Sequence, residues 1–384
     1  MSLPIRVMTR HFQLINEVNL YSSLQITRSW HGIGALELRI NRYLPGASKL
    51  IKGRIIFPHN KLNKAYVIKH CEIELDASGK ASENWIIRAL RLKSWTNQRI
   101  TYPPSTTAYD NKQDNAENVM RHYVTNNIIN PVDDNRRMKD IILSVNQMNG
   151  ENISWQSRYK NLAEELAEIS LLSGLGWNIE IDIETEKYVF KVLKGRNLST
   201  EQSILTPAIF SPEFNTLGQI SYAESELNFR NYAVVAGQGE GIERRIVEVG
   251  ESSGHDRYEL FVDARDVLEV TDDQYPALRT PEEIEADLIN RGNQTLTEYV
   301  QEVYLEGQAL TKSRLEYEKD YDLGDIVTLQ NREWGITRDA RITEVKEIYE
   351  PSGKQIELVF DNSRPTLISK IKQQMSGIKA EITK

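Results

Sequence analysis

This sequence of 384 residues lacks the features that would tie it to a membrane or to an oxidising compartment. Cys71 is its only cysteine, so no disulfide bond can form within one chain. No apolar run approaches the roughly 18 residues that a membrane-spanning helix requires, and the N-terminus has no apolar stretch typical of a signal peptide. Cys71 shares one face of a predicted strand with Val67, Ile73 and Leu75, which predicts a buried structural thiol. These absences favour a globular protein made in a reducing cytosol.

The sequence also lacks the spacing patterns of common catalytic, cofactor and metal sites. None of its six histidines stands two or four residues from another, and there is no H-E-x-x-H or G-x-S-x-G motif. The glycine loop 237–241 lacks the last glycine of a dinucleotide fingerprint, and a strand rather than a helix is predicted after it. Asp320, Asp322 and Asp325 lack the full alternation and the terminal Glu of an EF-hand loop. We therefore expect no catalytic residue, no cofactor and no bound metal.

Charge is distributed unevenly along a chain whose net charge is −8. Residues 1–105 contain 16 Lys and Arg against 6 Asp and Glu, whereas the remainder contains 31 against 49. A basic block can bind nucleic acid, or it can dock on an acidic module in the same chain or in a neighbour. No recognisable nucleic-acid module or Arg-rich helix accompanies the block. The sequence therefore favours docking, and direct nucleic-acid binding is not expected.

Residues 3–100 predict an all-β module, whose short alternating strands favour a small barrel. Leu36, Leu38 and Ile40 alternate with charged residues, as in a strand with one buried face. Residues 76–79 have the composition of a hairpin turn.

Residues 101–205 change to a mixed pattern and predict the first part of an α/β domain. Apolar residues of 116–128 share one helical face, and Asp114 with Glu117 forms a predicted capping box at its start. A second helix is predicted over about 157–174, where a glycine ends it, and a hairpin follows.

The rest of the chain predicts a second β module that an insertion interrupts. Strand patterns occur in residues 206–244 and return in 301–362, so we expect residues 233–236 to pair with the later segment. The inserted residues 245–300 form an acidic part of the α/β domain. Their helix begins at Thr280, which precedes proline and has a glutamate three positions on, as in a capping box.

Several segments, in order along the chain, resemble the siphophage Gp37-like tail family, and together they span nearly the whole sequence. Three of them, near residues 320–329, 341–349 and 355–360, predict β-strands. Gly324 lies just before the first of these strands, where a positive φ or a close backbone approach is expected. The resemblance implies an α+β, mainly β fold of the phage tail hub type. In that fold two similar small antiparallel β-barrels carry an inserted α/β domain and a C-terminal helix. The segments are residues 24–38, 115–120, 231–241, 258–266, 320–329, 341–349 and 355–360.

The resemblance implies a structural component of a phage or prophage tail tip, rather than an enzyme. Such a tail hub or tail-associated protein forms a ring that joins the tail tube to the distal tip or fibre. It implies a homotrimer that binds other tail proteins, assembled in the bacterial host cytoplasm and located in the virion tail, with no membrane and no small-molecule substrate. Two alternatives remain open, a tail-tip cell-wall hydrolase and a host-surface glycan-binding module that would use exposed tryptophans. Most tryptophans lie in apolar periodic runs, which favours core positions.

Two candidate assembly surfaces follow from charge and periodicity. Basic residues of the first module would face an acidic neighbour, and apolar residues of the predicted C-terminal helix 363–384 approximate a heptad seam that favours self-association. The first set is Arg39, Arg42, Lys49, Lys52 and Arg54, and the second is Leu367, Ile371, Met375, Ile378 and Ile382.

Overall fold

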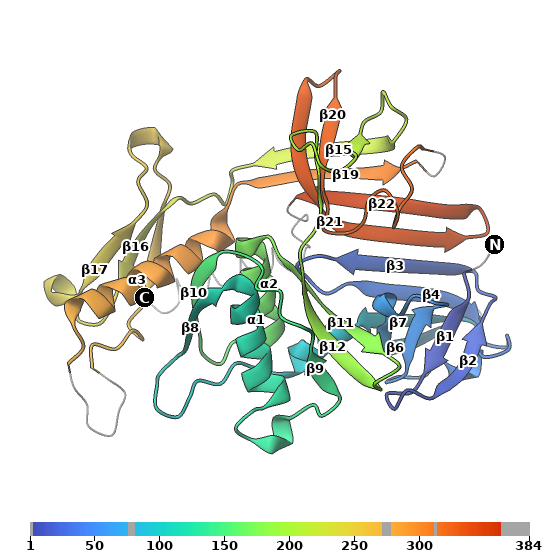
Figure 1. Ribbon diagram of the computed structural model, residues 1–384, viewed down its shortest axis with the longest axis horizontal. Helices are drawn as coiled ribbons and strands as arrows, with labels where there is room; N and C mark the ends of the chain where they lie inside the picture. Colours follow the sequence, from blue (N-terminus) through green and yellow to red (C-terminus); the bar gives the residue numbers. More distant parts are fainter. Residues whose placement is uncertain (1–2, 76–80, 271–277, 311–312, 362–384) are drawn as a thin grey trace.

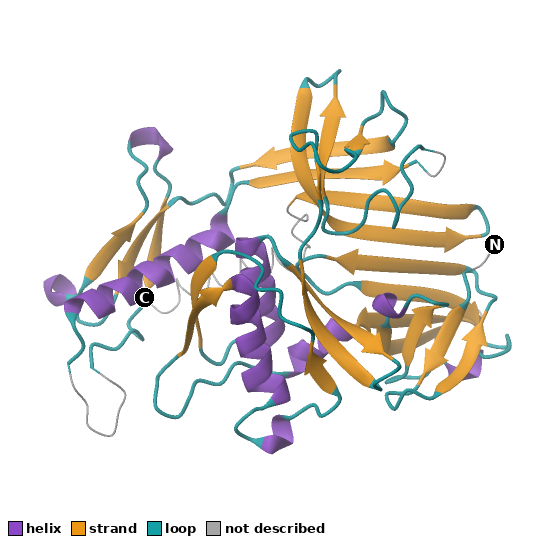
Figure 2. Cartoon of the chain, viewed as in Figure 1, coloured by secondary structure: helices purple, strands orange, loops and turns teal. Residues whose placement is uncertain are grey.

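The computed structural model describes residues 3–75, 81–270, 278–310 and 313–361. Within these residues the chain is mainly β, and its α-helices lie outside one long sheet (Figures 1 and 2). The α+β, mainly β class predicted from the sequence is confirmed. No helix of the described part is long and apolar enough to cross a bilayer.

Among the described residues the long sheet has 14 strands, and it includes both the first and the last strand in chain order. Its neighbouring strands along the main path are all antiparallel. In spatial order they are β15 (Leu217–Ser225), β19 (Glu302–Ala309), β22 (Gly353–Asp361), β21 (Ile336–Glu350), β3 (Ser23–Ser29), β4 (Ala35–Asn41), β7 (Ala81–Arg91), β6 (Tyr66–Leu75), β5 (Ile55–Pro58), β1 (Ile5–Met8) and β2 (Leu14–Val18). Off this path, β20 (Ile326–Asn331) pairs with β21, β13 (Asn197–Leu198) and β14 (Ile209–Phe210).

Each half of the long sheet wraps around its own apolar core. One core collects side chains from β1 to β7, including the alternating Leu36, Leu38 and Ile40, and we call residues 3–98 the N-terminal module. The other collects side chains from β13 to β15 and β19 to β22, and we call residues 197–225 with 302–361 the C-terminal module. Among the described strands the path is open from β15 to β2, so the two predicted barrels do not appear as closed barrels.

The α/β unit between the modules packs its helices on the N-terminal module and on short strands. It contains β8 (Asp110–Asn115), α1 (Ala116–Val124), β9 (Ile141–Leu143), β10 (Asn152–Ser157), α2 (Leu162–Ser173), β11 (Gly176–Asp182) and β12 (Lys187–Leu193). One apolar core joins α1 and α2 to Phe57 and Trp95 of the N-terminal module. The predicted hairpin is confirmed as the antiparallel pair β11 and β12.

Both helix starts in this unit differ from the sequence prediction. Asn115, not Asp114, caps α1, because its side chain accepts a hydrogen bond from the backbone N–H of Asn118. The second helix begins five residues later than predicted, because residues up to Ser157 belong to β10. Asn161 caps α2, because its side chain accepts hydrogen bonds from the backbone N–H groups of Ala163 and Glu164. The predicted glycine stop is confirmed at Gly174, which has a φ of 70°.

The inserted acidic unit is a three-stranded sheet covered by one helix. Its strands are β17 (Ile246–Val249), β16 (Tyr232–Ala236) and β18 (Glu259–Asp263), and α3 (Pro281–Leu296) packs on them. The capping box predicted at Thr280 is present. The pairing predicted for residues 233–236 is wrong, since β16 pairs only with β17 and β18 in the described part. A short apolar strand reveals its own conformation but not its partner.

Cys71 is exposed, and the sequence prediction of a buried thiol is wrong. The register of β6 against β7 shifts between Ile68 and His70. Such an irregularity breaks the alternation of faces, so the burial of Val67 does not carry over to Cys71 or to Ile73, which is 43% exposed. The turn predicted over 76–79 and the helical seam predicted over 363–384 lie outside the described residues.

Candidate functional site

The two modules are joined edge to edge by β3 and β21. From Ser29 opposite Glu344 to Leu24 opposite Tyr349, these strands pair as antiparallel neighbours. The backbone N–H of Trp30 continues the contact by donating to the carbonyl oxygen of Thr343 at 2.8 Å. Segments more than 300 residues apart in the sequence therefore form one continuous sheet, which Figure 1 shows between the blue and red strands.

Trp30 lies where the two modules and the α/β unit meet. Its side chain is 3% exposed, and its Nε1 donates to the carbonyl oxygen of Gly174 at 3.1 Å. A Cβ at Gly324 would lie 2.1 Å from the Trp30 ring, and one at Gly176 would lie 2.5 Å from it. Gly324 also has a φ of 92°. The expectation of a positive φ or a close approach at Gly324 is confirmed on both counts.

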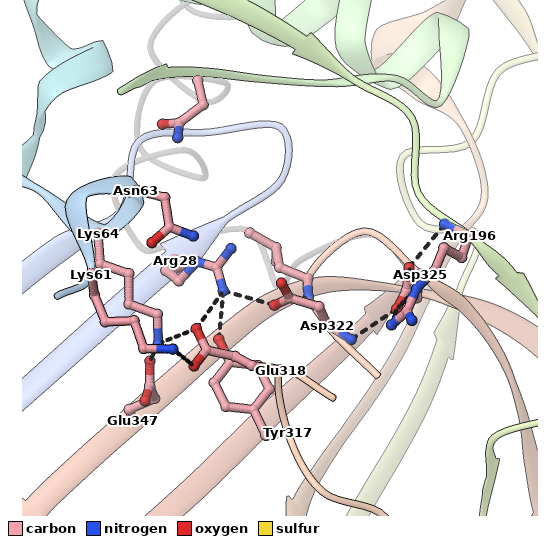
Figure 3. Close-up of polar contacts among 12 residues, drawn as sticks. Arg28, Lys61, Asn63, Lys64, Arg196, Tyr317, Glu318, Asp322, Asp325 and Glu347 are labelled. Carbon is pink, nitrogen blue, oxygen red and sulfur yellow. Dashed lines mark hydrogen bonds and ion pairs between the residues drawn. The ribbon is translucent and has the colours of Figure 1, made fainter. Parts of the chain in front are cut away.

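A buried lysine of the N-terminal module crosses this junction (Figure 3). Lys64 donates to Glu347 of β21 and, at 2.8 Å, to Glu318. Burial alone would raise the pKa of both carboxyls. The charge of Lys64 and hydrogen bonds from Lys64 outweigh it, and with Lys61 they lower the pKa of Glu318 to about 2. Both carboxylates are therefore ionised at neutral pH, and the buried charges compensate each other.

A second set of contacts ties β3 to the loop before β20. The Nη1 of Arg28 donates to Tyr317 and to Asp322, each at 2.7 Å. Three residues further along the chain, Asp325 accepts from the Nη2 of Arg196 at 2.6 Å and from the backbone N–H of Asp322 at 2.8 Å. These bonds fix the loop that carries Gly324 against the N-terminal module and against the segment between β12 and β13.

The cations of this junction come mainly from the N-terminal module and its carboxylates from the C-terminal module. The basic block predicted from the sequence to dock on an acidic module thus does so within one chain, at least through Arg28, Lys61 and Lys64. Buried pairs of this kind are strongly destabilised when one partner is lost. The arrangement therefore holds the two modules in one fixed relation.

A cavity of about 370 Å³ opens beside these contacts. Its walls come from both modules and from the α/β unit, and they combine guanidinium groups with indole rings. It is lined by, among others, Arg28, Trp30, Arg91, Trp177, Arg196 and Asp322.

The residues predicted as an assembly surface fall into two groups. Arg39, on β4, is neutralised by Glu37 at 3.0 Å. Lys49 and Lys52 are exposed in the segment between β4 and β5, and Arg54 donates to the carbonyl oxygen of Lys49 at 2.7 Å. In that segment Arg42 lies over the ring of Tyr43. Within the described residues, no carboxylate forms an ion pair with Arg42, Lys49, Lys52 or Arg54.

Sequence reasoning missed the buried cations of the junction, although the alternation of faces contains a signal for them. Arg28 has the same parity as the buried Leu24 and Ile26 on β3, and Arg91 has the same parity as Ile87 and Ala89 on β7. A charged residue on the apolar face of a strand needs a buried partner. That rule identifies Arg28 and Arg91 as residues of interest without naming their partners.

The glycine loop, the aspartates and the tryptophans named in the sequence analysis each have a defined place in the fold. Residues 237–241 begin the connection from β16 to β17, in which 241–243 form a short 3₁₀ turn. Asp322 and Asp325 bind Arg28 and Arg196, and in the described ranges no group of three or more His, Cys, Asp or Glu could hold a metal ion. Four tryptophans, Trp30, Trp95, Trp155 and Trp177, are buried as expected, whereas Trp334 is 46% exposed.

Comparison with known proteins gives one family and a shared fold. The family model described as Siphovirus ReqiPepy6 Gp37-like protein matches residues 4–360. No curated protein sequence matches the chain.

Two solved structures resemble the chain from end to end. The 43 kDa tail protein of prophage MuSo2 from Shewanella oneidensis has a TM-score of 0.54 and 10% identity, covering 93% of this chain and 98% of that one. A tail protein from Neisseria meningitidis MC58 has a TM-score of 0.55 and 11% identity, covering 94% and 97%. At these identities the likeness shows a common fold.

Proposed function

The chain belongs to the Siphovirus ReqiPepy6 Gp37-like protein family, and on that basis we propose that it is a structural component of a phage or prophage tail. The observation that carries the proposal is the family match over residues 4–360, which includes both modules and both inserted parts. Two tail proteins that share the fold over more than nine-tenths of the chain support it. The chemistry of the proposed role is association rather than catalysis.

We infer that the chain works in a ring at the tail tip, as a homotrimer that joins the tail tube to the distal tip or fibre. Three copies with two β modules each would present six similar modules to the tube. Residues 3–100 and the C-terminal module would form the ring, and residues 101–196 with the inserted part would form the α/β domain, which ends before 205 because β13 pairs with β20 of the C-terminal module. We end the first part of the C-terminal module near residue 225 rather than 244, because β16 pairs within the insertion.

The contact between copies would use cations that have no acidic partner among the described residues. Arg42, Lys49, Lys52 and Arg54 lie in the one segment that joins β4 to β5 of the N-terminal module, whereas Arg39 lies on β4 itself. An acidic surface of the neighbouring copy or of another tail protein would complement them and would steer encounter more than it adds affinity. The seam of Leu367, Ile371, Met375, Ile378 and Ile382 would add an apolar contact.

The proposal is tested by locating the chain in tail particles. An epitope-tagged copy is expressed from a phage or prophage that encodes this protein, and purified particles are labelled with a gold-conjugated antibody. We expect label at one end of each tail. Label absent from particles, with the protein remaining in the soluble lysate, would contradict a structural role.

Two assays separate the other candidate functions. A zymogram on bacterial cell wall tests the hydrolase, and we expect no clearing zone. Glycan binding by the purified chain tests the host-surface module, and the exposed Trp334 is the residue to substitute if binding is found.

A further inference from the structure

The cavity at the junction is lined by a buried cation, Arg91, that forms no ion pair with a carboxylate of the described residues. Arg91 is 3% exposed. Its Nη2 donates to two neutral acceptors, the carbonyl oxygen of Asn63 at 2.6 Å and the Oδ1 of Asn178 at 2.8 Å. Lys93 lies two residues further along the chain, outside the cavity lining, and it donates to the carbonyl oxygens of Ser29 and Trp177. Neither side chain has a carboxylate within ion-pair distance in the described ranges.

Two guanidinium nitrogens at this cavity also lack any hydrogen-bond acceptor. They are the Nη1 of Arg91 and the Nε of Arg28, both buried, in side chains that line the cavity. A buried donor without an acceptor costs about 1–3 kcal/mol, and more when it is charged. Both donors belong to the N-terminal module, on β3 and β7, and an acceptor in the cavity would satisfy them.

The carboxylates that line the cavity are already engaged. Asp322 accepts from Arg28, Asp325 from Arg196, and Glu318 from Lys61 and Lys64. Glu180 accepts from Lys191 at 2.7 Å. Lys194, exposed on the rim, adds a further positive charge. The unmatched charge around the cavity is therefore positive.

From these contacts we propose that the junction cavity binds a small oxyanion, a carboxylate or a phosphate group, through the Nη1 of Arg91 and the Nε of Arg28. Guanidinium groups bind such oxygen pairs with directed, charge-assisted hydrogen bonds. The indole rings of Trp30 and Trp177 would flank an attached apolar group. The cavity volume of about 370 Å³ lies at the small end of the roughly 300–1,000 Å³ typical of ligand sites. A bound anion would link Arg91 to Arg28, which itself binds Asp322 of the C-terminal module, and so stabilise the junction.

The site is tested by binding and thermal unfolding of the full chain with inorganic phosphate and, separately, with citrate, at constant ionic strength maintained with sodium chloride. We expect one or both anions to raise the unfolding temperature and to bind by calorimetry. Binding of phosphate alone assigns the oxyanion to a phosphate group, and binding of citrate alone assigns it to a carboxylate.

Variants identify the groups responsible. Arg91→Met removes the unpaired donor and is expected to weaken binding about tenfold or more, since 1.4 kcal/mol corresponds to a tenfold change. Arg88→Met is the matched control, because Arg88 lies on the same strand but binds Glu37 and Glu72 at the surface. It is expected to bind as the unsubstituted chain does. If Arg91→Met does not fold, Lys194→Gln on the rim is expected to weaken binding about two- to fivefold.

The inference is overturned if the folded chain binds neither anion at 10 mM, or if Arg91→Met and Lys194→Gln bind as tightly as Arg88→Met. In that case water fills the cavity. The tail role proposed above does not depend on this site and would be unaffected.

Discussion

Two contacts between units of this chain use carboxylates in opposite ways. At the junction of the two β modules, Glu318 and Glu347 each face a lysine from the other module. At the contact of α2 with the 3₁₀ turn that follows α3, Glu165, Glu168 and Glu298 gather around one lysine, Lys160. The first contact matches charges across a strand pair, whereas the second concentrates like charges between the α/β unit and its acidic insertion.

The difference predicts opposite responses to pH. The pKa of Glu318 is lowered to about 2, so its contribution to stability is present at neutral pH and is lost as pH falls from about 4.5 towards 2. Burial raises the pKa of Glu168 to about 7 despite the charge of Lys160, and Glu165 and Glu298 add to the rise. Its contribution is present below about pH 4.5 and is lost as pH rises through 7. The module junction is thus expected to be rigid at neutral pH. The contact between α2 and the 3₁₀ turn after α3 is expected to loosen as pH rises through 7.

The largest effect is expected from Trp30→Ala, which empties the point where three units meet. A buried tryptophan replaced by alanine costs about 3–5 kcal/mol, and the loss is read from chemical unfolding. Trp334→Ala is the matched control, since Trp334 is half exposed and is expected to cost below about 1 kcal/mol. Equal losses for the two variants would mean that Trp30 does not hold the junction.

Lys64→Met is expected to cost about 3 kcal/mol, the low end for breaking a buried ion pair. The loss stays low because Glu318 still forms an ion pair with Lys61, and Glu347 still forms one with Lys354. The double variant Lys64→Met, Glu347→Leu removes both buried charges and is expected to recover part of the loss. Chemical unfolding of the single and double variants measures this. A double variant less stable than the single one would show that the pair is not the source of the cost.

Glu168→Gln is expected to act in the other direction and to stabilise the chain at pH 8 by about 1–3 kcal/mol. The amide removes the cost of ionising a buried carboxyl beside Glu165 and Glu298. At pH 4.5 the variant and the unsubstituted chain should be equally stable, because Glu168 is then protonated. Thermal unfolding across this range tests the prediction, with Glu184→Gln in an exposed turn as the control. A variant that is less stable at pH 8 would reverse the assigned sign.

The smallest effects are expected where the basic segment would meet another copy. Lys49→Glu, Lys52→Glu and Arg54→Glu should each weaken association by about 0–1 kcal/mol, since exposed pairs contribute little. Arg39→Glu, whose partner Glu37 lies in the same chain, is the control. Sedimentation across a salt series reads the effect, because screening shortens to about 3 Å at 1 M salt. Association that strengthens with salt would indicate an apolar interface instead.

Local patterns predicted the elements of this fold far better than their partners. Alternation identified β4, and the capping box identified the start of α3, because both signals lie within a few residues. The pairing of β3 with β21 and the containment of β16 within the insertion depend on contacts far apart in sequence. The exposure of Cys71 depends on a register shift that no local pattern records. The resemblance to a family predicted the role. The partners of the buried cations Arg28 and Arg91, and the cavity that these side chains line, are visible only in the structure.

The central claim, that the chain is a structural part of a tail, is tested most directly by counting complete tails in its absence. The coding sequence is deleted from a phage or prophage that carries it, and particles are counted by electron microscopy with and without a complementing copy. We predict that complete tails disappear on deletion and return with the unsubstituted chain, but not with Trp30→Ala. Complete tails in normal number without the protein would contradict the claim.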